Sequence, residues 1–595
     1  MKVVVIDSGI SLTQSVYIEK KICIVRQRKE FIFDDNYWDE VGHGTAIIDV
    51  FLSKIEKRDE LHLSLVKLDN GSQIGYDLEQ LIFALDYIIN NIECDMLLIS
   101  SGTRVYSREM YFKLYSLYNK GVVIFSAFDN RGGISYPAAF DCVIGVDVTN
   151  CSGLRGNEFV YLCDNSINVV RKDKAYRVKW LNEQTNIVKG SSFVCGDIAG
   201  EFTNYCIKNK CVDYMATLQA FLTGQAKEVI YCEKKNRCET SVIKNCKKAA
   251  VFPFNKEIHA LASNEDLLMF EVVDYYDIRQ SGRVGISVDS ILKRTVNSKV
   301  IKNIEDICWE EADFDTFILG HCVEIENIVG SDIKNKIITN CRNFGKSLIV
   351  FDDVKEYVIP GLRYYQPHVD DFDVPYYNYG KLYLSNTPVL GIFGTSSKQG
   401  KFTLQLMLRR LFMQNGYRVA QIGTEPSSEL FGMDFVFPMG YNSSVSTKSN
   451  DNIAILNNFM HECEMKAPDI IIIGSQSGTC PYNIYNMSYF TLPQIEFLLG
   501  TQPDVVVLCV NVGDDLNYVN RTIKTIEGTV DCKVVAFSLF PRKMATSIEM
   551  ISTISNDTEL RRYKEELCNR FGMPVFLLDE KGAKLMYKYI IEQLS

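Results

Sequence analysis

Apolar and polar positions alternate in blocks along the first 225 residues. Short apolar runs such as VVVI, LHLSLVKL, DMLLIS and GVVIFSAF are separated by stretches of helical period such as YDLEQLIFALDYIINNI. Continuous apolar runs of about four to eight residues are typical of strands buried on both faces, and their alternation with helices predicts a parallel sheet. We therefore predict an α/β domain over residues 1–225.

Two further α/β segments follow a polar, cysteine-bearing connection at residues 226–246. Residues 247–387 carry short apolar runs (AAVFPF, RVGISV, FDTFILG, SLIVFDD) at helical separations. Residues 388–595 again alternate strand-like runs (APDIIIIG, PDVVVLCVN, CKVVAFSL) with helical ones. Because a single hydrophobic core stops growing at about 250–300 residues, a chain of 595 residues is expected to divide into domains in this way.

Composition and charge narrow the range of partners and compartments. The composition is ordinary for a globular protein, and a formal net charge of −10 offers no basic surface to nucleic acid or an anionic membrane. The opening MKVVVIDSGI has the pattern of a strand and not of a signal peptide, so we expect a cytoplasmic protein with reduced cysteines. A peptide, protein or small-molecule partner is expected, whereas self-association into a homo-oligomer stays open. No metal site is expected, because Cys232, Cys238 and Cys246 lack paired ligand spacing and a nearby histidine.

Three short motifs in the first domain carry Asp, His and Ser in a fixed order. VVVIDSGI puts Asp7 just past an apolar strand, and VGHGTAIIDVF puts His43 at the head of a helical pattern. GSSFVCGDIAGEF puts Ser192 where another helix should begin. Each motif alone is common in turns and helix caps, so the weight lies in their joint order, which is the triad order of subtilisin. We interpret them as a catalytic triad.

These motifs and the segments between them resemble the subtilisin-like serine protease family, whose signatures are D-[ST]-G, H-G-T and G-[ST]-S. The resemblance covers residues 1–210. It implies that Ser192 attacks a carbonyl, that His43 transfers the proton, and that Asp7 orients the imidazole. The segment SSGT resembles the family's substrate-binding strand, which implies that three residues bind substrate: Ser100, Ser101 and Gly102.

The same resemblance leaves the oxyanion donor open. The family uses an asparagine in a segment like S-A-G-N, and here SAFDN puts Asp129 on the donor position with Asn130 next to it. An ionised carboxylate cannot donate a hydrogen bond. Asp129 is protonated, or a one-residue shift makes Asn130 the donor, or backbone N–H groups suffice. Losing such a donor costs about 10²–10³ in rate, so we expect a slow and selective enzyme.

The third segment opens on a phosphate-binding pattern. GTSSKQGKFT follows the strand-like VLGIF and precedes a helical stretch, which is the context in which backbone N–H groups and a lysine hold phosphates. Phe402 stands where a hydroxyl would bind Mg²⁺ and Thr403 reaches that role only by a shift, so participation of Mg²⁺ stays open. A glycine-bearing turn that binds no phosphate is the alternative. The candidate nucleotide-binding residues are Gly394, Thr395, Ser396, Ser397, Lys398, Gln399, Gly400, Lys401, Phe402 and Thr403.

This loop resembles the G-T-D-x-x-x-G-K-T loop of dethiobiotin synthetase. It is more similar to that of a bacterial P-loop family that includes D-glutamate N-acetyltransferase. Thr424 and Glu425 after VAQIG and the stretch GSQSG after DIIII add to this resemblance, and residues 247–387 resemble the Rossmann-like half of the same family. The resemblance implies that ATP or acetyl-CoA binds the loop.

The predicted fold is α/β throughout. It comprises a subtilisin-like parallel-sheet domain at 1–225, a linker at 226–246, a Rossmann-like domain at 247–387 and a P-loop NTPase-like domain at 388–595. The predicted function is that of a cytoplasmic endopeptidase of narrow specificity that needs no cofactor for proteolysis. The fusion resembles peptide-maturation proteins of ribosomal peptide natural-product clusters, which implies a precursor peptide as substrate.

Two alternatives stay open. In the first, the P-loop module is the main enzyme, an ATP- or acetyl-CoA-dependent modifier of a peptide or amino acid, and the first domain is a peptide-binding scaffold. In the second, the first domain is a degenerate protease that recognises peptides without cutting them.

Overall fold

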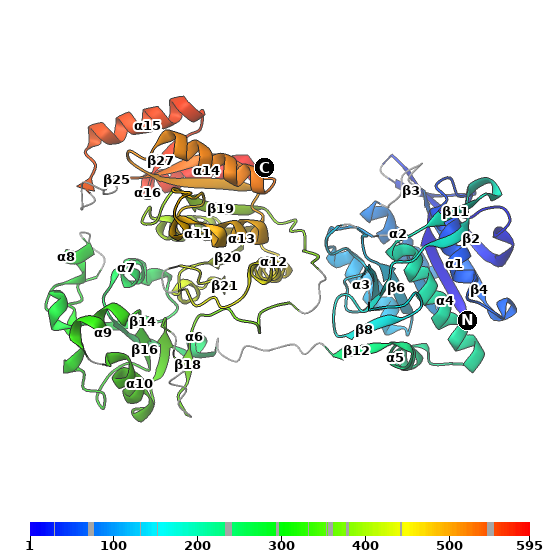
Figure 1. The fold of residues 1–595 in the computed structure, drawn as a ribbon, viewed down its shortest axis with the longest axis horizontal. Coiled ribbons are helices and arrows are strands. Elements are labelled where there is room, and N and C mark those ends of the chain that lie inside the picture. Colours follow the sequence, from blue (N-terminus) through cyan, green and yellow to red (C-terminus); the bar gives the residue numbers. More distant parts are fainter. Residues whose placement is uncertain are drawn as a thin grey trace. The chain divides into compact units, whose positions relative to one another are not determined.

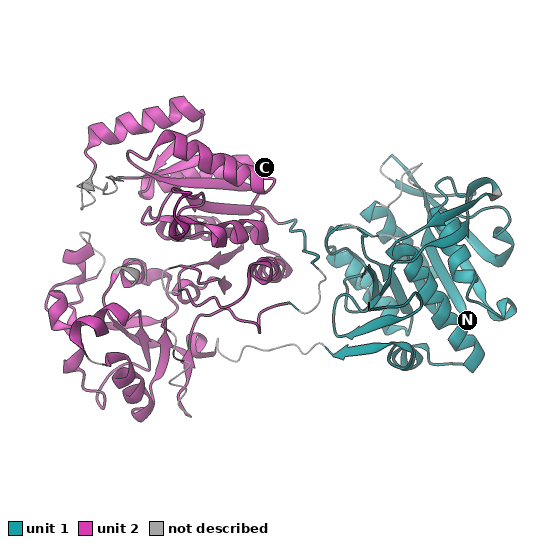
Figure 2. Ribbon diagram, viewed as in Figure 1, with its two compact units in different colours: residues 1–234, 375–386 teal, residues 235–374, 387–595 magenta. Residues whose placement is uncertain are grey.

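The protein is α/β, with mostly parallel sheets, which confirms the predicted fold class (Figure 1). The chain forms two compact units, residues 1–234 with 375–386 (unit 1) and residues 235–374 with 387–595 (unit 2) (Figure 2). The computed structural model describes residues 1–28, 30–69, 77–100, 102–130, 132–150, 153–231, 241–292, 297–330, 332–352, 354, 361–375, 380–440, 443–543 and 553–594.

Unit 1 is built on a ten-stranded sheet in the order β12-β8-β9-β7-β6-β5-β1-β4-β2-β3. Neighbouring strands are parallel except for the pairs β2·β3 and β8·β9. The strands are β1 (Lys2–Asp7), β2 (Ile18–Gln27), β3 (Glu30–Asp34), β4 (His62–Asp69), β5 (Met96–Ile99), β6 (Val123–Ala127), β7 (Ile144–Thr149), β8 (Phe159–Cys163), β9 (Val169–Lys172) and β12 (Glu228–Tyr231). The remaining elements are the hairpin of β10 (Tyr176–Lys179) and β11 (Thr185–Val188), and the helices α1 (His43–Leu52), α2 (Leu78–Asn91), α3 (Arg108–Asn119), α4 (Ser191–Asn209) and α5 (Tyr214–Gln225).

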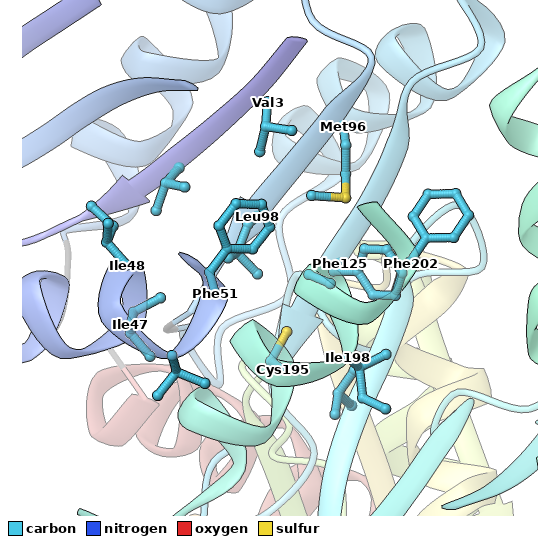
Figure 3. Close-up of a cluster of buried hydrophobic side chains, with 14 of the residues drawn as sticks. Val3, Ile47, Ile48, Phe51, Met96, Leu98, Phe125, Cys195, Ile198 and Phe202 are labelled. Atoms are coloured by element: carbon cyan, nitrogen blue, oxygen red, sulfur yellow. The ribbon is translucent and has the colours of Figure 1, made fainter. Parts of the chain in front are cut away.

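Helices cover both faces of this sheet and leave the carboxyl end of β1 for polar residues. On one face α1 and α4 pack against the strands through Phe51, Ile198 and Phe202 (Figure 3). On the other face α2 and α3 pack through residues such as Leu85 and Leu114. Because β1 runs between β4 and β5, its last residue emerges at the middle of the sheet edge, where open α/β sheets place their ligands.

Unit 2 contains two wholly parallel sheets. The first has the order β15-β14-β13-β16-β17-β18, which is the 3-2-1-4-5-6 order of a Rossmann fold and agrees with the predicted Rossmann-like domain. Its strands are β13 (Lys248–Phe252), β14 (Glu271–Asp277), β15 (Lys302–Asn303), β16 (Thr316–Leu319), β17 (Ser347–Val350) and β18 (Tyr364–Tyr365). Its helices are α6 (Ser241–Asn245), α7 (Lys256–Ser263), α8 (Val288–Leu292), α9 (Val323–Val329) and α10 (Ile333–Asn343).

The second sheet of unit 2 has the order β21-β20-β22-β19-β23-β24-β27 and places the fully buried strand β19 at its centre. Its strands are β19 (Val389–Gly394), β20 (Val419–Gly423), β21 (Phe435–Val436), β22 (Ile470–Gly474), β23 (Val505–Asn511), β24 (Lys533–Phe540) and β27 (Val575–Leu577). The other elements are the short pair β25 (Arg542–Lys543) and β26 (Thr553–Ile554), and α11 (Lys401–Gln414), α12 (Ser449–Met465), α13 (Leu492–Thr501), α14 (Leu516–Thr529), α15 (Asp557–Phe571) and α16 (Glu580–Leu594).

The predicted connection at residues 226–246 contains regular structure at both ends. Residues 228–231 form β12 on the edge of the unit 1 sheet, and residues 241–245 form α6. Residues 232–240, with two of the three cysteines considered above, lie outside the described residues. The predicted domain limits stay a prediction. Within the described part of the chain, none of the helices combines the length and apolar character needed to cross a membrane.

Candidate active site and phosphate-binding loop

Asp7, the last residue of β1, is the buried centre of a small hydrogen-bond network. Its Oδ1 lies 2.9 Å from Nδ1 of His43 and accepts a hydrogen bond from the Ser8 N–H at 2.7 Å. Ser100, which directly follows the neighbouring strand β5, donates from Oγ to Oδ2 of Asp7. The predicted substrate-binding residue Ser100 is therefore buried against the carboxylate. Gly102 follows nearby with its backbone against Tyr136, and Ser101 lies outside the described residues.

His43 begins α1, and a carboxylate fixes this start of the helix. Both oxygens of Asp39 accept hydrogen bonds from the turn, one from the Gly42 N–H at 2.8 Å and the other from the Thr45 N–H at 2.8 Å. The indole of Trp180, at the end of β10, lies against Gly42. The sequence analysis missed Asp39 and Trp180; an Asp before a helical pattern is a capping signal that could have revealed the first.

The charges of Asp7 and His43 stabilise each other. Burial works to raise the pKa of Asp7, but the charge and hydrogen bond of His43, with the bond from Ser100, outweigh it and leave the pKa below its usual value. Burial likewise disfavours protonated His43, yet the Asp7 charge and hydrogen bond prevail and raise the pKa of His43. The pair thus holds the imidazole in one orientation, with Nδ1 towards Asp7.

Ser192 is the second residue of α4 and is half-buried. The ring of the next residue, Phe193, has its centroid 5.4 Å from the centroid of the His43 ring, so the first turn of α4 lies beside the imidazole. Both Ser192 and His43 are described, and no hydrogen bond joins their side chains. The structure therefore joins Asp7 to His43 directly and brings Ser192 only into their neighbourhood.

Of the two candidate oxyanion donors, Asn130 is the one beside the start of α4. Its Oδ1 accepts a hydrogen bond from the Ser191 N–H at 2.5 Å. Asp129 instead directs its carboxylate to Arg104, whose Nη2 lies 2.7 Å from Oδ2, and accepts a hydrogen bond from the Gly132 N–H at 3.1 Å. This geometry favours the one-residue shift among the three alternatives. Arg104 had no signal in the sequence.

The candidate phosphate-binding loop joins β19 to α11, as its sequence pattern predicts. Lys401, the first residue of α11, has its side chain buried, and its Nζ donates to the Ser396 carbonyl at 2.7 Å. Ser397 and Lys398 are exposed at the tip of the loop. Phe402 packs its ring against Phe431, at a centroid distance of 5.7 Å, within the apolar cluster that also contains residues of the first sheet. Its side chain is half-buried and packs against the core.

A half-buried carboxylate that the sequence analysis missed ties this loop together. Asp514, just after β23, accepts hydrogen bonds from Thr395 Oγ1 at 2.5 Å and from Gln399 Nε2 at 3.2 Å. The Asn511 amide donates to Ser396 Oγ at 3.1 Å. Burial raises the pKa of Asp514 more than these hydrogen bonds lower it. An acidic pair directly after a buried strand, GDD, was the available signal.

The remaining predicted positions of this loop are its two glycines and Thr403. Gly394 ends β19, with its carbonyl accepting the Thr479 N–H at 2.9 Å, and Gly400 caps the start of α11. Thr403 is half-buried in the first turn of α11. Thr424, named with the family resemblance, donates from Oγ1 to the Gly474 carbonyl at 3.0 Å at the same sheet edge. Among the described residues, no group of three or more His, Cys, Asp or Glu side chains is arranged to hold a metal ion.

Comparison with known proteins identifies one domain family. Residues 379–586 match a family model described as "Domain of unknown function (DUF1611_C) P-loop domain", so this part of the chain is a P-loop domain. No curated protein matches the chain. Membership of the narrower acetyltransferase-containing family stays a prediction.

Solved structures with similarity to the chain fall into two groups. A DUF1611 family protein from Anabaena variabilis ATCC 29413 is 13% identical, with a TM-score of 0.42 over 58% of this chain and 99% of its own. An S41 psychrophilic protease is 20% identical, with a TM-score of 0.30 over 37% of this chain and 82% of its own. A cold-adapted subtilisin-like serine proteinase is 14% identical, with a TM-score of 0.32 over 39% and 89%.

Proposed function

We propose that unit 1 is a serine endopeptidase with Ser192 as nucleophile, His43 as general base and Asp7 as the residue that orients the imidazole. The hydrogen bond between Asp7 and His43 Nδ1, next to the first turn of α4, carries this proposal. It leaves Nε2 to take the proton of Ser192 as Oγ attacks the scissile carbonyl. The same proton then goes to the leaving amine, and water repeats the sequence on the acyl-enzyme. Catalytic hydrogen bonds are often long or poorly aligned before substrate binds, so the absence of a hydrogen bond between Ser192 and His43 is compatible with these roles.

The oxyanion formed in this attack needs donors that are already in position. Ser192 contributes its backbone N–H at the start of α4, where the helix dipole also favours negative charge. Asn130 is the side-chain donor we propose. Because its Oδ1 accepts from the Ser191 N–H, the two N–H bonds of its amide remain for the oxyanion.

A fluorophosphonate probe tests the triad directly, because it reacts only with an activated serine. Wild-type protein should be labelled at Ser192, whereas Ser192→Ala should lose labelling and about 10⁶ of any peptidase rate. Ser15→Ala is the matched control, since the Ser15 hydroxyl is exposed and bonds only to a nearby carbonyl. Folded wild-type protein that takes up no label would refute the proposal.

The same assay separates the two candidate donors. Asn130→Ala should lower the maximal labelling rate by about 10²–10³, because one oxyanion donor is lost. Asp129→Asn should leave it within a few-fold of wild type, because the Asp129 carboxylate faces Arg104. The reverse pattern, with Asp129→Asn raising the rate at high pH, would identify protonated Asp129 as the donor instead.

We further propose that the substrate is a single precursor peptide and that the P-loop domain binds ATP or acetyl-CoA. The indole of Trp180 lies against Gly42, and the ring of Phe193 lies against His43. Bulky side chains therefore occupy space next to the imidazole, which favours a restricted range of substrates. Lys401 and the backbone N–H groups at the start of α11 are the phosphate-binding groups of the module.

A second candidate function rests on Asp514. This half-buried carboxyl group has a raised pKa and accepts hydrogen bonds from Thr395 and Gln399 of the phosphate-binding loop, where a proton donor or acceptor would serve group transfer. The P-loop module would then modify a peptide or amino acid, and unit 1 would bind the peptide. ATP- or acetyl-CoA-dependent modification that survives Ser192→Ala but is lost in Lys401→Ala would favour this function.

A further inference from the structure

A short segment from the second half of the sequence belongs to unit 1. The chain leaves unit 2 after residue 374, contributes residues 375–386 to unit 1, and re-enters unit 2 at residue 387 (Figure 2). In the sequence, this segment follows β18, the last strand of the Rossmann sheet, and precedes β19, which leads into the phosphate-binding loop. We call residues 380–385 the strap.

Consecutive residues of the strap contact the loop that follows β6. The Leu382 carbonyl accepts a hydrogen bond from the Ile134 N–H at 2.9 Å, and a Cβ added to Gly133 would lie 2.3 Å from that carbonyl oxygen. The Tyr383 hydroxyl lies 3.4 Å from Ser166 Oγ, and its ring packs on the apolar cluster of Phe128 and its neighbours. The contact is therefore close enough to depend on a glycine at position 133.

Lys381 makes the contact nearest to the candidate catalytic residues. Its Nζ donates to the Asp129 carbonyl and lies 3.4 Å from Oδ2 of Asp147. The Asp147 side chain is buried and that of Lys381 is mostly so, with 3% and 11% exposed. Asp147 belongs to β7, whose neighbour β6 ends just before this loop. The ammonium group thus ties the loop to the sheet.

The hydrogen bond from Lys381 to the Asp129 carbonyl also restrains the next residue, Asn130. The carbonyl of Asp129 and the N–H of Asn130 belong to one planar peptide group, so a bond that fixes the carbonyl fixes the backbone from which the Asn130 side chain extends. A preorganised donor stabilises an oxyanion only if it is held where the charge develops. Asn130 is held on its other side by the Ser191 N–H.

We propose that Lys381 is a positioning residue for Asn130, and that the strap makes the oxyanion site of unit 1 dependent on the second half of the chain. This inference rests on the proposed protease function. It means that the protease unit is completed by a segment only a few residues before β19, the strand that leads into the phosphate-binding loop.

The test measures fluorophosphonate labelling of the full-length protein, separating the maximal labelling rate from the probe affinity. Lys381→Met should lower the maximal rate by about 10- to 100-fold, which is no more than the loss expected when one oxyanion donor is removed. It should leave the probe affinity and the pH midpoint of labelling unchanged. Lys381→Arg should restore most of the rate. The matched control is Lys227→Met: Lys227 also bonds a carbonyl and a carboxylate of unit 1, those of Gly153 and Glu158. Wild-type rates in Lys381→Met would overturn the proposal.

A mutant cycle shows whether Lys381 acts through Asn130. In an Asn130→Ala background, Lys381→Met should change the maximal rate by less than about twofold, because the donor that it positions is already gone. A full additional loss would refute the positioning role. The double variant Lys381→Met with Asp147→Asn removes the buried carboxylate left without its cation, so it should recover thermal stability without recovering labelling. Recovery of labelling there would mean that Lys381 only neutralises Asp147.

Different results would refute the proposed role of the strap and the proposed protease function. Wild-type protein that takes up no probe refutes the protease, whereas labelled wild type with equally labelled Lys381→Met refutes only the strap. Hydrogen exchange in the peptide covering residues 128–135 gives a readout independent of catalysis. It should be faster in Lys381→Met than in Lys227→Met, and equal rates would contradict the strap.

Discussion

At the scale of single residues, the protonation of His43 controls the proposed chemistry. The imidazole must be neutral to accept the Ser192 proton, and its pKa is raised because the Asp7 charge outweighs burial. Labelling should therefore be low at acidic pH and rise as pH passes through this pKa, with a midpoint above the value of about 6.5 for an unperturbed histidine.

Removing the Asp7 charge shifts that midpoint in a predictable direction. Asp7→Asn takes away the group that favours the imidazolium, so the midpoint of the labelling rate against pH should move to lower pH. The maximal rate should fall by about 10⁴, because the imidazole loses its orientation and tautomer. A pH series of labelling rates on both proteins measures the two effects. A midpoint that does not move would show that another group controls the acid limb.

The residues that sequence analysis found and missed differ in how far along the chain their partners lie. Asp7 and His43 sit in short motifs whose spacing carries their chemistry, so they could be predicted without coordinates. The choice between Asp129 and Asn130 could not, because a one-residue shift leaves the sequence pattern unchanged and only the contact with Ser191 distinguishes them. Lys381 and Asp514 act across 252 and 119 residues, on Asp129 and Thr395, and no local pattern marks such pairs.

At the scale of elements, the junction between β11 and α4 is a part of unit 1 where a small substitution should affect the proposed oxyanion donor. Gly190 caps α4 with φ of 128°, a conformation that L side chains rarely adopt, and a Cβ there would lie 2.7 Å from the Asn130 amide. Gly190→Ala should therefore displace Asn130 and lower labelling by about 10², as well as destabilising the unit. Gly156→Ala, where no atom lies within 4 Å of the added Cβ, is the control. Labelling rate and thermal unfolding measure both effects, and wild-type labelling in Gly190→Ala would contradict this account.

Strands buried on both faces could be predicted from their apolar runs, and edge elements could not. VVVI in β1 and IIII in β22 are continuous and apolar because helices cover both faces of their sheets. By contrast, β12 (EVIY) pairs on one side only and lies within the predicted connection. Its half-exposed pattern is too weak to separate it from a polar linker, so pairing with β8 is what makes it a strand.

At the scale of the whole molecule, one short segment groups with a unit that is distant from it in the sequence. The sequence analysis placed residues 375–386 at the end of the α/β segment 247–387. In the structure these residues belong to unit 1. No local sequence pattern marks this grouping, because the partners of the segment, Gly133 and Asp147, lie more than 200 residues earlier in the sequence.

The P-loop domain should bind its ligand independently of the proposed protease. Lys401 is the lysine at the start of α11, the position from which a P-loop lysine reaches phosphates, so Lys401→Ala should weaken binding of ATP or acetyl-CoA, measured by calorimetric titration. Mg²⁺ should add less to ATP binding than in an ordinary P-loop protein, because Phe402 places an aromatic ring against the core where a metal-binding hydroxyl would stand. Lys524→Ala is the control, since this side chain is exposed on α14 and lies outside the loop. Absence of binding by wild type at millimolar concentration would make the loop structural.

The same variants decide whether the two activities are coupled. A ligand shifts a distant site only through contacts that differ between two states of the protein. The hydrogen bonds described for Thr395, Ser396 and Gln399 run within the loop and to residues 509–518, and none of them reaches the strap. We therefore expect Lys401→Ala, and saturation of the wild type with ligand, to change Ser192 labelling by less than about twofold. A larger change that disappears in Lys381→Met would show that occupancy of the loop is transmitted through the strap, and would overturn the expected independence.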